Sequence, residues 1–337
     1  MKKLFLCVVV GVLSGALLLS AGCGGNAEEK NNAKEVNAKQ TETHLKVATS
    51  NTSGTWYIVG AAFTKLFQEK SPSIKWNVQS SGASVENCRL VGTKQVQVGY
   101  AMSDVAYYAY KGEREFKEKG FNNLRVLLGG NIMHYHLATR KDSGIQNIQD
   151  LRGKKIYWGT PGSGTQMMNI TVLEAAGLKA GVDYTGVQLS LGDAVEAIKD
   201  GDIDAIGHVS GIPIPGIMDL FTTKESRFIN IDDDTLNKVA KEHFYWPKGA
   251  IPAKSYVGQN KDASTVECGT VVVTNIDLPD DVAYNIAKAI IENSKDYMSV
   301  HKACGDYNVK NTIKANKESG IPFHPGTERY LKEIGAI

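Results

Sequence analysis

The sequence lacks both a charge bias and a second long apolar run. The 337 residues include 38 Lys and Arg and 36 Asp and Glu, so the formal net charge is +2. Lys and Arg form no stripe interleaved with aromatic residues, so we expect no nucleic-acid partner. Beyond residue 21 no apolar run is long enough to cross a bilayer. We therefore expect the protein to be attached to a membrane rather than embedded in it.

Cysteine is scarce, and its spacing fits neither a disulfide framework nor a zinc site. Of the five cysteines, Cys7 and Cys23 belong to the N-terminal region. The remaining Cys88, Cys268 and Cys304 are an odd number, which argues against a full set of bridges. We expect Cys88 to pack as a small core residue, and a Cys268–Cys304 bridge is an open alternative. No His cluster accompanies them, so the sequence predicts neither a metal nor a cofactor.

Catalytic signatures are also missing. Residues 159–165 superficially resemble a phosphate loop, but Gln166 stands where that loop needs a lysine. The segment also lacks the glycine spacing of a dinucleotide fold. His134 and His136 alternate on one predicted strand and could offer two metal ligands, but no third ligand is evident. We therefore expect a binding protein and no enzyme, and turnover of a small acid would revive the enzyme alternative.

The N-terminus carries a targeting pattern. Lys2 and Lys3 precede an almost wholly apolar run over residues 4–21, and small residues then lead directly to Cys23. This order predicts a signal peptide over residues 1–22. It resembles the lipobox of bacterial lipoproteins, with Ser20 where leucine is usual, so we expect Cys23 to be lipidated. An uncleaved membrane anchor is the alternative.

Residues 23–43 follow as a polar segment. From residue 26 they are rich in Asn, Ala, Glu and Lys, with Val36 as the one bulky apolar residue. Such a segment cannot bury enough apolar surface to fold. We expect a flexible tether that begins at a lipidated Cys23 and holds the folded part on the extracytoplasmic side of a bacterial membrane.

From residue 44 onward, strand-like and helix-like runs alternate. The predicted strands are residues 45–48, 75–79, 96–101, 126–128, 136–139, 155–158, 184–188, 205–208 and 227–229. The predicted helices are residues 56–67, 85–91, 104–110, 166–176, 192–199 and 280–294. This alternation predicts an α/β fold built on parallel sheets, with helices on both faces.

About 290 residues suit two lobes better than one. Residues 137–156 are our candidate for the first crossing between lobes, and the β-rich run 268–274 for the return crossing. Two crossings would place residues 44–139 and 275–337 in lobe 1 and residues 140–274 in lobe 2.

The tripeptide Ser-Gly-Thr occurs twice, as Ser53-Gly54-Thr55 and Ser163-Gly164-Thr165, each time between a predicted strand and a predicted helix. A helix N-terminus presents unpaired N–H groups and the positive end of the helix dipole, so it attracts anions. Two such ends, one in each lobe, could grip one small anionic or zwitterionic molecule. The plainer alternative is that both tripeptides only cap helices.

Similar small polar loops follow other predicted strands, where α/β proteins bind ligands. The candidate ligand contacts are Ser53, Gly54, Thr55, Tyr57, Ser81, Gly82, Ser84, Ser103, Tyr157, Thr160, Gly162, Ser163, Gly164, Thr165 and Ser210. For Ser84 and Ser103 a capping role is an open alternative, and for Tyr57 and Tyr157 a core role is.

Further aromatic and basic residues are weaker candidates. Tyr107 and Trp246 could pack against a ligand, but a core role suits them at least equally well. Trp158 could do the same and, like Tyr157, adjoins the second loop. The basic residues Arg89, Arg125 and Arg140 could clamp a carboxylate. Arg89 lies beyond the first turn of its predicted helix and Arg140 near the hinge, so we favour neither.

Helix ends alone cannot bind a solute tightly. Each contributes ~0.3–1 kcal/mol when exposed and ~2 kcal/mol when partly buried, whereas a micromolar complex needs about 8 kcal/mol. Closure of the lobes must therefore exclude water and strengthen direct hydrogen bonds to the solute. We expect a closed and nearly dry bound state.

Four stretches of the chain are distinctive: Gly82-Ala-Ser-Val-Glu-Asn-Cys-Arg-Leu-Val91, Met102-Ser-Asp-Val-Ala-Tyr-Tyr-Ala-Tyr110, Gly159-Thr-Pro-Gly-Ser-Gly-Thr165 and His324-Pro-Gly-Thr-Glu-Arg-Tyr330. In this order and spacing they resemble the TAXI-type solute receptors of TRAP transporters. The resemblance implies a two-lobed periplasmic-binding-protein fold of type II that delivers its solute to a TRAP membrane permease. It also implies small acids such as glutamate, glutamine or 2-oxoglutarate as ligands. The alternative is a binding lipoprotein of an ABC importer, which would have the same fold and cleft.

Overall fold

The computed structural model describes residues 42–160 and 163–337. The predicted signal peptide, Cys23 and nearly all of the predicted tether lie outside the described residues. Within the described ranges no helix is both long enough and apolar enough to span a membrane.

One mixed sheet runs through the molecule in the order β2-β1-β3-β10-β4-β7-β5-β6. On one side, β1, β2 and β3 are parallel, and on the other β5, β6 and β7 are parallel. Their bounds are β1 Thr43–Ala48, β2 Ile74–Gln79, β3 Val98–Met102, β5 Lys155–Tyr157, β6 Thr185–Val187 and β7 Ala205–Ser210. The two long strands β4 (Leu124–Arg140) and β10 (Ala263–Asn275) run antiparallel between these sets. The short strands β8 (Ser226–Phe228) and β9 (Lys248–Ile251) pair with β4 and β10.

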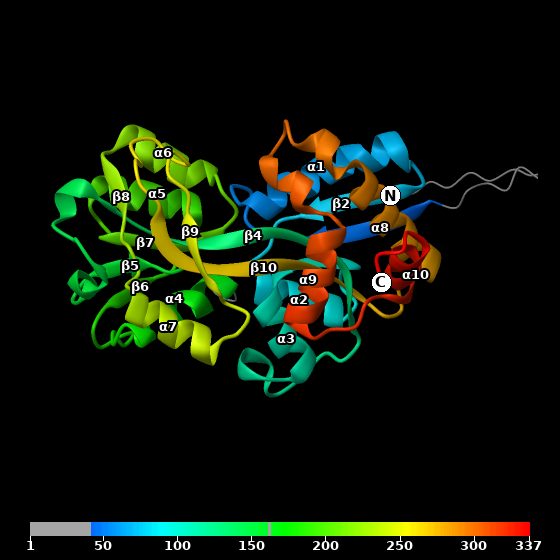
Figure 1. The fold of residues 1–337 in the computed structure, drawn as a ribbon, viewed down its shortest axis with the longest axis horizontal. Coiled ribbons are helices and arrows are strands. Elements are labelled where there is room, and N and C mark those ends of the chain that lie inside the picture. The colour runs from blue at the N-terminus through cyan, green and yellow to red at the C-terminus, as the bar shows by residue number, and fades with distance from the viewer. Residues whose placement is uncertain (1–41, 161–162) are drawn as a thin grey trace, which may run out of the picture. The chain divides into compact units, whose positions relative to one another are not determined.

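Helices cover both faces of the sheet and form two groups (Figure 1). The first lobe holds α1 Thr55–Lys70, α2 Ser84–Gly92, α3 Ser103–Lys111, α8 Asp280–Asn293, α9 Val309–Ser319 and α10 Pro325–Glu333. The second lobe holds α4 Gly164–Ala175, α5 Leu191–Asp200, α6 Pro215–Thr223 and α7 Asp233–Glu242. This is the predicted α/β, two-lobed arrangement of type II, with two strand crossings. The exact residue limits of the lobes stay a prediction.

The central strands are buried on both faces. Every residue of β3 and of β7 is buried, as expected for strands covered by helices on each side. One hydrophobic cluster extends from Val47 and Phe63 in the first lobe to Met168 and Leu173 in the second. The lobes are therefore packed against each other in this structure.

The crossing between the lobes differs from the prediction. Residues 126–128 and 136–139, predicted as two strands, belong to the single strand β4, and β4 itself makes the first crossing. Its residue Val126 pairs with β10, while His136 pairs with β7 in the second lobe. The predicted return run 268–274 lies inside the longer β10.

Two adjacent glycines explain why the sequence suggested a break in β4. A Cβ atom on Gly129 would collide with the backbone of Asn311, and one on Gly130 would lie 2.6 Å from the Tyr307 ring. Both glycines therefore permit close packing of the C-terminal segment against the strand. They do not interrupt the strand.

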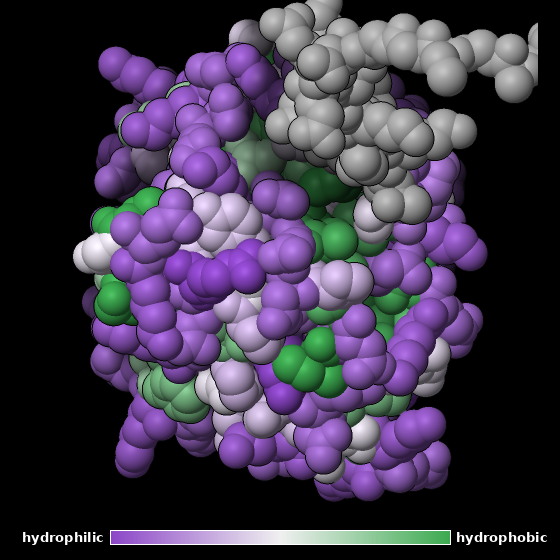
Figure 2. Space-filling model, turned by 90° about the vertical axis from the view of Figure 1, so that its right-hand side faces the viewer, coloured by the Kyte–Doolittle hydropathy of each residue, from purple (hydrophilic) through white to green (hydrophobic). Residues whose placement is uncertain are grey.

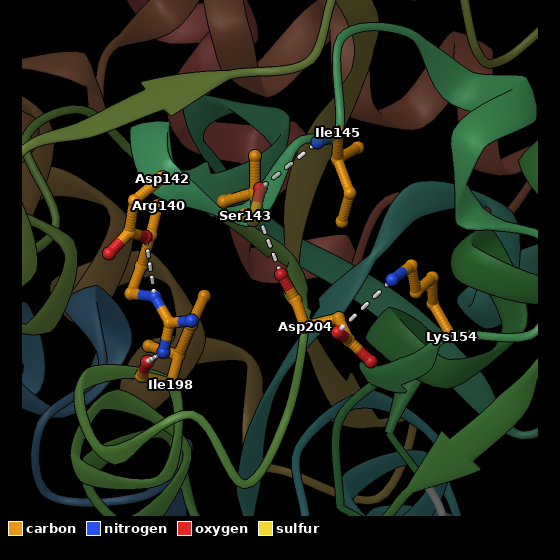
Figure 3. Close-up of polar contacts among 8 residues, drawn as sticks. Arg140, Asp142, Ser143, Ile145, Lys154, Ile198 and Asp204 are labelled. Atoms are coloured by element: carbon orange, nitrogen blue, oxygen red, sulfur yellow. Dashed lines mark hydrogen bonds and ion pairs between the residues drawn. The ribbon is translucent and has the colours of Figure 1, made fainter.

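The end of β4 is fixed to the second lobe by side chains (Figure 3). The Arg140 guanidinium donates to the Ile198 carbonyl at 2.8 Å and pairs with Asp142 at 3.0 Å. Nearby, Lys154 pairs with Asp204 at 3.7 Å. Arg140 is thus engaged in holding this turn inside the second lobe, where it pairs with Ser226 of β8, and it does not lie at the crossing, which is made earlier in β4.

Figure 2 shows the face at the end of the first lobe that carries α8 and α10. Hydrophilic side chains dominate it, and hydrophobic ones occur in small groups between them. Ile334 and Ile337, which are 44% and 49% exposed, are among the large exposed hydrophobic residues of the chain. Scattered exposure of this kind is ordinary for a protein surface.

The cysteines of the folded part are all unpaired. Cys88, Cys268 and Cys304 are free and buried in the core. The core role expected for Cys88 is confirmed, and the alternative Cys268–Cys304 disulfide is absent. Burial raises the pKa of the Cys304 thiol to about 11, so this thiol stays protonated at neutral pH.

Candidate functional site

A small cavity lies where α1, α2 and α4 begin, between the two lobes. Its volume is about 40 Å³, which holds a few water molecules at most. Its lining residues are Ser50, Asn51, Gly54, Thr55, Trp56, Ser81, Ala83, Ser84, Met102, Met133, Tyr157, Gly159, Thr160, Ser163, Gly164, Thr165, His208, Val209 and Ser210. A molecule of the size of glutamate could enter and be held only with the lobes further apart than in this structure.

The N-terminus of α1 has no side-chain cap. Its N-cap residue is Gly54, and no side chain accepts a hydrogen bond from the first turn. The Gly54 N–H donates to the Asn51 carbonyl at 3.0 Å, which folds the preceding loop tightly. The first N–H groups of a helix have no partner within the helix. This end of α1 therefore offers donors and a positive dipole to the cavity.

The N-terminus of α4 is capped by its own serine. The Ser163 hydroxyl accepts from the Gln166 N–H at 3.3 Å, and the Ser163 N–H donates to the Thr160 carbonyl at 3.2 Å. The plainer alternative, a helix cap, is therefore realised at Ser163. Part of the hydrogen-bonding capacity of this end is already used.

A third helix, α2, begins on the first-lobe side of the cavity. Its N-cap residue Ala83 adopts a positive φ of 72°, an uncommon conformation for a residue other than glycine. The Ser81 hydroxyl accepts from the Ala83 N–H at 3.1 Å and donates to Asn87 at 2.7 Å. The Ser84 hydroxyl accepts from the Met102 N–H at 3.1 Å. Side chains thus hold this strained turn in place.

Direct contacts join the lobes across the cavity. The Ser210 hydroxyl at the end of β7 donates to the Thr55 hydroxyl of α1 at 3.0 Å. Gly164 lies so close to the other lobe that a Cβ atom there would collide with the Met102 sulfur and lie 3.1 Å from the Ser84 hydroxyl oxygen. The structure is therefore a closed state of the cleft.

Tyr157 and His208 form a neutral wall of the cavity. Their rings are stacked with centroids 6.0 Å apart, and the Tyr157 hydroxyl lies 3.4 Å from His208 Nδ1. Burial lowers the pKa of His208 to about 4, and burial also raises the pKa of Tyr157 well above its usual value. Both side chains are uncharged at neutral pH.

The electrostatics of the cavity come from backbone dipoles. The described lining residues include no Asp, Glu, Lys or Arg, while three helices direct their N-termini toward the cavity. Each N-terminus carries about half of a positive charge. The arrangement can therefore stabilise a negatively charged group, while hydroxyl groups supply directional hydrogen bonds.

Most of the predicted ligand contacts line this one cavity. They are Gly54, Thr55, Ser81, Ser84, Tyr157, Thr160, Ser163, Gly164, Thr165 and Ser210. Gly162 lies outside the described residues. A role of any of these residues in binding stays a prediction.

Four predicted contacts lie apart from the cavity lining. Ser53 donates to the Asn51 side chain at 2.9 Å, and the Gly82 N–H donates to the Glu86 carboxylate at 2.6 Å. Ser103 is fully buried and donates to the Gly269 carbonyl at 3.2 Å. Tyr57 lies in the first turn of α1 outside the lining. The local hydrogen bonds of Ser53, Gly82 and Ser103 serve the loops and the core.

The weaker aromatic and basic candidates lie elsewhere. Trp158 packs edge-on against Tyr184 at 6.2 Å, and Trp246 is fully buried. Arg89 donates to the Glu115 carbonyl and Arg125 to the Leu124 carbonyl, each at 2.7 Å.

Sequence reasoning missed several lining residues. Ser50 and Asn51 precede the first tripeptide, and His208 ends a predicted strand directly before the Ser210 loop. Their position beside residues that were singled out was an available signal. Met102 directly precedes Ser103, so the same signal was available for it. Met133 carries no such signal, because only the packing of the lobes brings its side chain to the cavity.

The two histidines considered for metal binding have other partners. His134 pairs with Glu267 at 3.2 Å, and the His136 ring lies 3.0 Å from the Tyr256 hydroxyl. Within residues 42–160 and 163–337 no group of three potential metal ligands occurs.

Comparison with known proteins agrees with this architecture. The chain shares its fold with the alkanesulfonate-binding protein SsuA from Xanthomonas axonopodis pv. citri bound to MOPS, at 15% identity and a TM-score of 0.50. That match covers 87% of this chain and 84% of the other. A protein of Bordetella bronchiseptica RB50 is similar at 16% identity and a TM-score of 0.51, with 88% and 90% of the two chains covered.

A family model matches far more than half of the sequence. The match is to the NMT1-like family and runs over residues 47–335, which includes every described element from α1 to α10. The chain therefore belongs to the NMT1-like family.

Proposed function

We propose that this protein is an extracytoplasmic receptor that closes its two lobes around a small anionic solute. The observation that carries the proposal is the convergence of three helix N-termini on an interlobe cavity whose described lining has no charged side chain. Such a site holds an anion by dipoles and hydrogen bonds and releases it when the lobes open.

The proposed solute is a small organic acid. The TAXI resemblance favours a carboxylate such as glutamate or 2-oxoglutarate. A sulfonate is the other anion to test, because the similar alkanesulfonate-binding protein was solved with MOPS. Both groups accept several hydrogen bonds at once, which suits hydroxyls and N–H groups that converge from two sides.

The proposed location is the outer side of a bacterial membrane, with Cys23 as the lipidated anchor. Support comes from the apolar run and small residues that precede Cys23. Mass spectrometry of the mature protein tests this part. An unmodified N-terminus beyond Cys23 would contradict it.

The solute is then handed to a membrane importer. An ABC importer is better supported, by the family match and by the likeness to an alkanesulfonate-binding protein. A TRAP permease is the alternative, supported by the four stretches that resemble TAXI-type receptors. The adjacent reading frames discriminate the two: an ATPase with its permease, or a TRAP membrane subunit.

Thermal shift with purified protein tests the solute class. The panel contains MOPS, simple alkanesulfonates, 2-oxoglutarate, glutamate and glutamine. We expect at least one anion to raise the melting temperature, because a ligand that binds only the folded state stabilises it. A matched variant, Gly164→Val, should lose the shift while it keeps a cooperative melt. If every member of the panel leaves the melting temperature unchanged, the proposal fails for these solute classes.

A further inference from the structure

A seam of aromatic side chains joins the lobes at a place separate from the cavity lining. Tyr107 and Tyr108 belong to α3 in the first lobe, whereas Tyr245 and Trp246 follow α7 in the second. The hydroxyls of Tyr108 and Tyr245 contact each other, and their rings are edge-on with centroids 5.8 Å apart. The Tyr107 ring lies 6.3 Å from that of Tyr245. Because its two sides belong to different lobes, this seam exists only in the closed state.

Asp104 lies beneath the seam without a partner. It is fully buried, and its carboxylate oxygens have no hydrogen bond of good geometry to the described residues, although the Trp246 indole and the backbone N–H groups of Asp104 and Val105 lie near them. The Trp246 indole N–H faces the Asp104 carboxyl group, but it too lacks a partner in hydrogen-bonding geometry among the described residues. An ionised carboxylate in such a place is costly, so burial favours the neutral acid.

One cation acts on this group. The Arg114 guanidinium lies over the Tyr108 ring, 4.9 Å from its centroid, and its charge favours the ionised form of Asp104. The other titratable groups around Asp104 and its neighbours are Cys88 from α2, Cys268 from β10, Tyr108 on α3, His243 and Tyr245 from the second lobe, and Glu318 with Lys314 from α9.

These influences combine in favour of the neutral acid. Burial raises the pKa of Asp104 to about 7, while the Trp246 indole, backbone N–H groups at the start of α3 and the Arg114 charge lower it. Opening of the lobes would carry Tyr245 and Trp246 away and admit water. The pKa should then return toward 3.8, the usual value for this group.

We propose that Asp104 is a proton-binding site that couples closure of the lobes to pH, with the closed state taking up one proton. The proposal rests on the proposed function in one respect, namely that the lobes open and close. It requires no particular solute, and it adds a proton as a second species that the closed protein binds.

The sign of the coupling follows from linkage. The closed state binds more protons than the open state between about pH 4 and pH 7, so acid favours closure. The closed-to-open ratio should fall by up to tenfold for each pH unit across this window. Below and above the window the ratio should be constant.

Small-angle X-ray scattering of the purified full-length protein, without added solute, tests the proposal. We expect the wild-type closed-to-open ratio to fall by tenfold or more between pH 5 and pH 8. Asp104→Asn should stay closed at both values, because the amide cannot ionise. Asp232→Asn is the control: this carboxylate caps α7 within the second lobe, where it accepts from the Thr235 N–H at 2.8 Å. It should behave as the wild type.

Two outcomes would overturn the proposal: a wild-type profile unchanged from pH 5 to pH 8, or an Asp104→Asn profile that still opens with rising pH. If Asp104→Asn does not fold, Trp246→Phe takes its place, and loss of the indole N–H should extend the closed state to higher pH. An unchanged Trp246→Phe profile would then count against the proposal. The thermal-shift experiment with solutes is separate. Closure that depends on pH, without a response to any solute of the panel, would contradict the proposed function for these solute classes and leave the proton site supported.

Discussion

The two Ser-Gly-Thr tripeptides stand at equivalent places in the two lobes but begin their helices differently. In the first lobe Gly54 is the N-cap and α1 has no side-chain cap, whereas in the second lobe Ser163 is the N-cap and bonds to Gln166. The helix thus begins one residue later within the first tripeptide. The same three residues leave one helix end open to a solute and satisfy part of the other.

Each lobe contains a buried asparagine with a similar set of hydrogen bonds, Asn87 in α2 and Asn169 in α4. Asn87 donates to the Thr49 and Tyr100 carbonyls at 2.7 and 2.8 Å and accepts from the Ser81 hydroxyl. Asn169 donates to two carbonyls at 3.0 and 2.8 Å and accepts from a tyrosine hydroxyl at 2.7 Å. Each buried amide ties its helix to a neighbouring strand, Asn87 to β3 through the Tyr100 carbonyl and Asn169 to β7 through the Gly207 carbonyl. The two lobes therefore differ in how the tripeptide helices are capped, but each contains a buried asparagine that bonds its helix to a strand.

The largest expected loss of stability comes from replacing either buried asparagine. Asn87→Ala and Asn169→Ala each remove three side-chain hydrogen bonds, two to carbonyls and one from a hydroxyl, and each bond contributes about 1 kcal/mol. We expect each variant to lose roughly 3 kcal/mol or more of unfolding free energy, measured by urea denaturation. A large loss for only one variant would show that the two lobes depend on their amides unequally.

The next effect concerns the unfolding free energy in acid, on which one buried group in each lobe acts in the opposite direction. His208 in the second lobe has its pKa lowered from 6.5 to about 4 by burial. The unfolded chain therefore binds more protons between these values, and stability is lost as the pH falls from 6.5 toward 4. At about 1.4 kcal/mol for each pKa unit the loss approaches roughly 3 kcal/mol.

His208→Asn should remove this loss, as seen in urea denaturation at pH 7 and pH 4.5. Asp104 in the first lobe works in the opposite sense, because its raised pKa adds stability as the pH falls from 7 toward 4. Asp104→Asn should therefore steepen the acid loss. If both variants keep the wild-type pH profile, the two groups do not titrate as their burial requires.

The third prediction compares side chains introduced at Gly54 and Gly164. A side chain on Gly164 would strike Met102 and Ser84 in the opposite lobe, whereas one on Gly54 would meet Ser50 and Asn51 of its own loop. Gly164→Val should hold the lobes apart and weaken solute binding by about 1–3 kcal/mol, the usual cost of overpacking. Gly54→Val should lower the melting temperature but leave closure intact. Scattering profiles of the two variants distinguish these outcomes.

The smallest effect concerns the serines of the tripeptides. Ser163→Ala removes a helix cap and should cost about 1 kcal/mol of unfolding free energy. Ser53→Ala removes one partly exposed hydrogen bond to Asn51 and should change stability by less than about 0.5 kcal/mol. Thermal denaturation of the pair measures the difference. Equal losses would mean that the Ser163 side-chain cap does not stabilise α4 more than the Ser53 hydrogen bond stabilises the loop before α1.

Much of the fold could be predicted from local pattern. The predicted strand 205–208 became β7 and the predicted helix 280–294 became α8, because their apolar spacing matches the strand and helix periods. The C-terminal helices α9 and α10 were not predicted. The continuous β4 was also missed, because Gly129 and Gly130 usually mark a break and here serve close packing.

The sequence by itself determined the α/β alternation and the placement of small polar loops at strand ends, since both depend on residues close together in the chain. Two lobes were expected from the chain length and the family resemblance. Only the tertiary structure decided which of those loops meet. It brought Met133 and His208 to the cavity and placed Asp104 beneath Trp246. Burial and its pKa shifts depend on neighbours that are distant in sequence, so no local pattern could reveal them.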